Sequence, residues 1–174
     1  DPIHPPLTNN EQTQQSLDAL AQETGNFPSS YVRKFEHALI QGSHQLIPCS
    51  RYVWSSLNHH VGRVEASMNL LSYLHDWGSG LHLSTEDRLL LVAHGHAGRV
   101  LALLSNIMTR GESEVRSRVF EILAKYWQAC PSENRSVEHL ERLFRLTTDR
   151  KVLDGASVDV VTLGTPIRYG WDTE

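Results

Sequence analysis

The stretch Leu89–Leu104, LLLVAHGHAGRVLALL, constrains the fold of this chain more than any other. Its first four residues are apolar and predict a buried strand, whereas the apolar residues from Val100 onward recur with the spacing of a helix face. Small residues and histidines, AHGHAG at 93–98, separate the two halves. The order is therefore strand, sharp turn, helix. Such a turn exposes one residue at its apex and places the free N–H groups of a helix N-terminus behind it.

This turn resembles the nucleophile elbow of the α/β-hydrolase family, in particular that of its lipase- and esterase-like members. The family elbow reads Gly-x-Ser-x-Gly, typically within a Gly-His-Ser-x-Gly-Gly run. Here Ala93 and Ala97 replace the outer glycines, and Gly95 stands at the position of the nucleophilic serine. The resemblance implies the fold, but glycine has no side chain that could attack a substrate.

A second motif, Leu163-Gly164-Thr165-Pro166, is also lipase-like. It ends a predicted strand over residues 157–163, and in the family it follows the strand that comes after the elbow helix. The motif falls at that place in this chain. Two matches in the right order, both at strand ends, favour the hydrolase family more than either does alone.

Three strands are predicted, over residues 46–54, 88–94 and 157–163, with helices between them, one of which covers 63–77. Such an order predicts an α/β fold, a doubly wound parallel sheet with flanking helices joined by right-handed crossovers. Parallel sheets are buried on both faces and usually contain more strands. We therefore expect an incomplete part of a hydrolase-like domain, whose sheet is completed by additional polypeptide.

The 174 residues predict a single domain. Residues 1–28 predict an irregular arm with a short helix over 11–23, and a second helix is expected over 31–41. Residues 110–151 form a helical insertion with two amphipathic patterns, which the resemblance implies is a lid or cap; extra helices that cover the core are the alternative. The chain begins at Asp1 without a methionine or a signal-like segment, so we expect a processed or trimmed product.

The remaining catalytic groups are incomplete. In the family the order along the chain is nucleophile, acid, histidine. The resemblance implies that the backbone N–H of His96 is an oxyanion donor and that Asp172 is the candidate acid; a solvated loop carboxylate is the ordinary alternative for Asp172. No histidine follows Asp172, and no signature of a second oxyanion donor precedes residue 46. The sequence therefore places neither the general base nor that donor.

Composition excludes several other classes. The net charge of −4, with mixed signs, gives no basic footprint for nucleic acid. No run of about 18 apolar residues predicts a membrane span. Cys49 and Cys130 lack the spacing of a disulfide framework or a metal site, which favours ordinary thiols and a cytoplasmic location.

A metal site is the weaker alternative, with His94-x-His96 and the pair His59-His60 as its candidate ligands. Three or four converging ligands are normally required, and residues at i and i+2 of a turn rarely point at one ion. We therefore expect no metal and no cofactor.

Two function classes follow. In the first, the chain resembles a serine lipase or esterase that acts on a small-molecule ester or lipid-like ligand, and glycine at the nucleophile position leaves it inactive as it stands. In the second, it is a non-catalytic hydrolase-like domain that binds a ligand or another protein. Gly95 and the incomplete triad favour the second class directly.

Overall fold

The computed structural model describes residues 16, 19–20, 27–55, 59–109, 113–130, 135–148, 153 and 155–166. Where the sequence predicts one domain, the chain divides into two compact units, residues 1–55 and 56–174. Within the described residues, no helix is both long enough and apolar enough to cross a membrane.

The N-terminal unit contains helix α2, Ser29–Ser43, which confirms the helix predicted over 31–41. It ends at His44, whose left-handed φ of 58° lets its N–H donate to the carbonyl oxygen of Ile40 at 2.8 Å. The rings of Phe27, Tyr31 and Phe35 stack along one side of the helix. Of the helix predicted over 11–23, residues 16, 19 and 20 are helical, and the others lie outside the described residues.

The strand predicted over 46–54 is wrong, because residues 46–55 form neither a helix nor a strand. A strand exists only through the ladder of hydrogen bonds to a neighbour. Here the N–H of Cys49 donates to the Glu36 carboxylate at 2.9 Å, and Pro48 has no N–H to offer. The residues of this segment alone therefore do not make it a strand.

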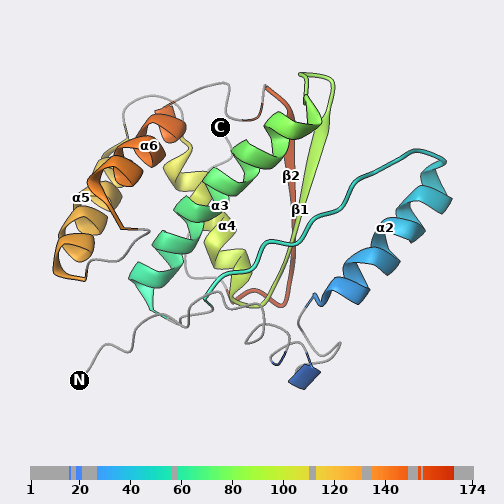
Figure 1. Ribbon diagram of the computed structural model, residues 1–174, viewed down its shortest axis with the longest axis horizontal. Helices are drawn as coiled ribbons and strands as arrows, with labels where there is room; N and C mark the ends of the chain where they lie inside the picture. The colour runs from blue at the N-terminus through green and yellow to red at the C-terminus, as the bar shows by residue number, and fades with distance from the viewer. Residues whose placement is uncertain are drawn as a thin grey trace. The chain divides into compact units, whose positions relative to one another are not determined.

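The second unit contains the described elements α3 (His60–Leu81), β1 (Arg88–His94), α4 (Ala97–Ile107), α5 (Glu114–Ala129), α6 (Val137–Thr148) and β2 (Ser157–Leu163), as Figure 1 shows. β1 and β2 are parallel, with Arg88 opposite Ser157 and His94 opposite Leu163. This arrangement confirms mixed α/β content with parallel strands. Helix α3 contains the helix predicted over 63–77, and α5 and α6 correspond to the two amphipathic patterns of the insertion.

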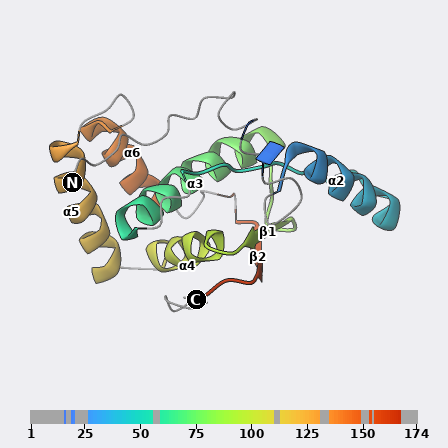
Figure 2. The same cartoon turned by 90° about the horizontal axis from the view of Figure 1, so that it is seen from below.

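Helices α3 and α4 lie side by side and cover one face of β1 (Figures 1 and 2). The Ser67 hydroxyl lies 2.8 Å from the carbonyl oxygen of Arg63 and 2.9 Å from that of Val100, which links the two helices. Leu89 and Ala93 of β1 are buried on the covered face. The helices supply the rest of this core through the buried apolar residues Met68, Leu71, Leu74, Val100, Leu101 and Leu104.

In the described part of the second unit, the other face of the sheet carries exposed apolar side chains. Residues that alternate with the buried positions of β1 share this face with their partners on β2. Leu90 and Val92 are 47% and 37% exposed, and Val161 and Leu163 are 43% and 46% exposed. The Arg88 guanidinium and the Asp159 carboxylate, 2.8 Å apart, lie at one end of this apolar surface. We call these four apolar residues the bare face.

The insertion is held against the helices by buried polar contacts. Both carboxylate oxygens of Glu65 on α3 accept from the guanidinium of Arg135, at 2.7 and 3.1 Å, and Glu65 also accepts from the indole N–H of Trp127 at 3.2 Å. The Arg135 guanidinium lies 5.0 Å from the centre of the Tyr126 ring. These contacts join α3 to α5 and to the segment that precedes α6.

A second buried arginine joins three helix ends. Arg116 lies in the first turn of α5, and its guanidinium donates to the carbonyl oxygens of Ile107, Thr109 and Thr147 at 3.4, 3.0 and 3.3 Å. A cation is favourable at the C-terminal ends of helices, where the helix dipole is negative. Arg116 therefore joins the N-terminal end of α5 to the C-terminal ends of α4 and α6.

We expect Arg135→Met to lower the free energy of unfolding by about 2 kcal/mol, because it leaves the carboxylate of Glu65 largely buried without its guanidinium. Lys125→Met is the matched control, since Lys125 and Glu121 form an exposed ion pair, and a change within about 0.5 kcal/mol is expected there. Urea unfolding followed by tryptophan fluorescence measures both. Equal losses in the two variants would contradict this account of how the insertion is held.

Candidate active site at the strand–helix turn

The strand, turn and helix predicted from the sequence form at residues 88–107. β1 ends at His94, Gly95 takes a left-handed φ of 56°, and α4 begins at Ala97 with His96 as its N-cap. A Cβ atom added to Gly95 would meet no atom within 4 Å. Position 95 is therefore a half-buried apex at which an added side chain would project into open space.

The N-terminus of α4 lies directly behind the apex. Its first turn closes with the N–H of Gly98 donating to the carbonyl oxygen of Gly95 at 3.3 Å and that of Arg99 donating to His96 at 3.1 Å. The N–H groups of His96 and Ala97 precede these bonds, and such groups of a helix N-terminus can stabilise an anion. The oxyanion role of the His96 N–H stays a prediction. The His94 and His96 side chains are both exposed on either side of the apex.

The two motifs singled out in the sequence contact each other. The N–H of Gly95 donates to the carbonyl oxygen of Leu163 at 2.8 Å, which continues the ladder beyond the strands. A Cβ on Gly98 would lie only 2.1 Å from Oγ1 of Thr165, so the helix can approach the turn this closely only with glycine at position 98. Residues 95–99 and 163–166, far apart in the chain, thus form one packed unit.

Sequence reasoning missed Arg99 as part of this unit. Its side chain is only 6% exposed, and its Nε–H donates to the carbonyl oxygen of Pro166 at 3.1 Å. A basic residue in the first turn of a helix, where the dipole disfavours a cation, was the available signal.

No histidine base is placed beside the apex by the described contacts. His59 is the N-cap of α3, and its Nδ1 accepts the N–H of Gly62 at 2.9 Å, so this ring serves the helix. His139 on α6 stacks on the Trp127 ring at 5.7 Å, and burial, with the nearby Arg142, lowers its pKa. Asp172 lies outside the described residues.

The metal alternative gains no support from the geometry. In the part of the chain that the structure describes, no three side chains of His, Cys, Asp or Glu come together so that they could hold a metal ion. Among the described residues, His94 and His96 flank the apex, and no third ligating side chain completes a metal site with them.

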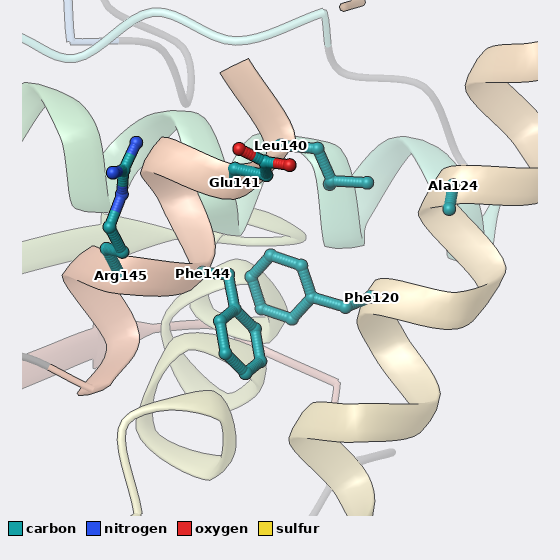
Figure 3. Close-up of a pocket in the computed structure, with 6 residues that line it drawn as sticks. All are labelled: Phe120, Ala124, Leu140, Glu141, Phe144 and Arg145. Atoms are coloured by element: carbon teal, nitrogen blue, oxygen red, sulfur yellow. The ribbon is translucent and has the colours of Figure 1, made fainter. Parts of the chain in front are cut away.

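A groove of about 470 Å³ lies between α5 and α6, away from the apex (Figure 3). Phe120 and Phe144 meet edge to face at its centre, with ring centroids 4.9 Å apart, and Glu141 and Arg145 lie at its rim. Ala124 and Leu140 complete the lining. All six residues belong to the helical insertion, and whether this insertion acts as a lid over the apex stays a prediction.

Comparison with known proteins adds no family: no protein-family model, no curated protein and no solved structure matches the chain.

We expect Gly98→Ala to lower the free energy of unfolding by about 2 kcal/mol or more, the cost of forcing a methyl group into well-packed atoms. The atom it would meet first is Oγ1 of Thr165, together with Cγ2 at 2.6 Å. Gly80→Ala is the matched control, because a Cβ at Gly80, within α3, meets nothing within 4 Å. There alanine should be neutral or stabilising by up to about 1 kcal/mol. Thermal unfolding of the two variants side by side measures the difference, and equal values would refute the close packing of α4 on residue 165.

Proposed function

We propose that this chain is a hydrolase-like domain of lipase or esterase descent whose elbow is intact as backbone and lacks its nucleophile. The observation that supports it most is position 95 itself. It combines a strand-to-helix apex, a left-handed φ and open space for a side chain with the N-terminus of α4 directly behind it. These are the features by which a nucleophile elbow presents a serine hydroxyl beside an oxyanion donor.

With a serine at position 95, a base would take the hydroxyl proton as the oxygen attacks the ester carbonyl, and the N–H of His96 would stabilise the oxyanion of the tetrahedral intermediate. Collapse of that intermediate would release the alcohol, which takes the proton back from the base, and leave the acyl group on the serine. Gly95 supplies no hydroxyl, so the chain is inactive towards esters as it stands. The ligand class that fits the proposal is a small carboxylic ester or a lipid-like ester, and Asp172 remains its acid candidate.

We expect Gly95→Ser to react with a fluorophosphonate probe, whereas the parent chain does not. Hydrolysis of short-chain nitrophenyl esters also needs a base and an acid, so turnover reports whether those groups are present. Gly95→Ala is the matched control, because it adds the same Cβ at φ 56° without a hydroxyl. Both variants should lose about 1 kcal/mol of stability to the left-handed conformation. Labelling and turnover are measured at equal folded fraction, as judged by circular dichroism.

A folded Gly95→Ser protein that neither labels nor turns over ester would count against hydrolase descent. Labelling without turnover would mean that the apex and oxyanion donor work while the base or acid is missing. Equal labelling of the alanine variant would show that the probe reacts elsewhere.

The bare face favours a second function, that of a domain completed by another polypeptide. A parallel sheet is normally covered on both faces, and an apolar surface left in water is typical of an interaction site. β2 supports this reading further, because Val158 and Val160 on its other face are also 44% and 40% exposed. In this proposal the added polypeptide contributes a strand or a helix that covers β2.

We expect the isolated chain to self-associate through the bare face and the double variant Val92→Lys with Val161→Lys to shift association to at least about tenfold higher concentration. Val115→Lys with Val137→Lys is the matched control, since these exposed valines lie on α5 and α6. Sedimentation velocity over a concentration series measures the association. A parent chain that is monomeric throughout, or equal effects of both double variants, would contradict the second function.

A further inference from the structure

Arg99 occupies a place that is energetically unfavourable for a charged side chain. Arg99 is a buried residue, only 6% exposed, and it belongs to the first turn of α4. Burial penalises a charge, and the positive end of the helix dipole repels a cation. Neither propensity nor core packing explains why a cation lies there.

The contacts made by Arg99 and its neighbours follow the same order along both segments. Gly95 binds Leu163 through its N–H, Gly98 packs on Thr165, and Arg99 binds Pro166 through Nε. The residues that meet are thus 95 with 163, 98 with 165 and 99 with 166. All three contacts join two segments, and each segment begins at the carboxyl end of one of two neighbouring parallel strands.

Leu163 is the last residue of the ladder, and residues 164–166 form neither a helix nor a strand. Gly164 takes a left-handed φ of 61°, and a Cβ there would meet nothing within 4 Å. Its position is defined by the contacts on either side, at Leu163 and at Thr165–Pro166. Removal of the Arg99 contact would leave the outer end of the segment held by the packing of Thr165 alone among these three contacts.

We propose that Arg99 is a positioning residue, which locks the turn after β2 against the first turn of α4 and thereby fixes the geometry of position 95. Arg99 touches no substrate in this account. It acts through the carbonyl oxygen of Pro166, and the Leu163 carbonyl then holds the Gly95 N–H in place. Its consequence for ester chemistry rests on the proposed function, but its effect on the apex does not.

The test is amide hydrogen exchange in the parent chain and in Arg99→Met, followed by NMR. The quantity measured is the exchange rate of the Gly95 N–H divided by that of Leu71, a buried residue of α3. A general loss of stability speeds both amides equally where both exchange through global unfolding, and speeds Leu71 alone where Gly95 exchanges through local opening, so it does not raise this ratio. We expect the ratio to rise about tenfold or more, as befits the loss of a hydrogen bond to a charged donor.

Arg142→Met is the matched control, because Arg142 is an exposed arginine that pairs with Asp76 and does not contact the apex. Its ratio should stay within about twofold of the parent's, since surface substitutions change stability little. If Arg99→Met does not fold, Arg99→Leu decides, because its shorter apolar side chain also lacks the Nε donor. An unchanged ratio in the folded Arg99 variant overturns the inference.

Fluorophosphonate labelling of Gly95→Ser, with and without Arg99→Met, separates this inference from the proposed function. If Gly95→Ser labels, the second substitution should slow labelling about tenfold at equal folded fraction. A labelling rate that Arg99→Met leaves unchanged overturns the positioning role. Failure of Gly95→Ser to label removes the proposed function alone, and the exchange ratio still decides the role of Arg99.

Discussion

The close approach of α4 to the turn after β2 is the contact on which the second unit depends. It requires glycine at position 98, because Thr165 occupies the space where a Cβ would stand. β1 passes into α4 through only two residues, so the position of the helix relative to β2 also sets how its apolar face meets α3. If a methyl group at position 98 displaced α4 outward, the buried side chains of Val100 and Leu101 would lose their packing contacts. The contact between α4 and Thr165 would be lost as well. The absence of a side chain at position 98 is thus a requirement that the turn, the helix and the core share.

Different forces hold the two sides of the helix pair. Towards β1 the contacts are apolar, whereas the insertion is fastened to α3 and α4 by buried arginines, through Arg135 with Glu65 and through Arg116 with helix carbonyls. Buried ion pairs contribute little net stability against a well-packed apolar alternative, but they tolerate no misplacement of their partners. The insertion is therefore held in a defined position more than it is held strongly.

The strand–turn–helix and the second motif were predictable because each is a local pattern of apolar periodicity and turn residues. Pairing was not predictable, since the bond between Arg99 and Pro166 and that between Arg135 and Glu65 join residues 67 and 70 positions apart. The strand predicted over 46–54 failed for the same reason. An apolar run becomes a strand only beside a neighbour, and the backbone N–H of Cys49 is bound by a carboxylate instead. The sequence could predict that part of the sheet is exposed, because two or three parallel strands leave faces uncovered.

The bare face and the apex are parts of one surface, which ties the two candidate functions together. Val92 and Val161 are directly opposite each other, and the next pair in register is His94 with Leu163, where both strands end beside Gly95. Ligands of open parallel sheets bind at the carboxyl ends of the strands. A polypeptide that covered the bare face would therefore reach the apex as well, from the side that α4 leaves open. In the proposed function this side is also open to a histidine base, and His59 and His139 make their described contacts elsewhere, on α3 and against Trp127. In the proposed function, completion of the sheet would then also complete the catalytic groups. Glycine at position 95 takes the left-handed conformation without the strain that serine would carry, so it stabilises the turn with or without that completion.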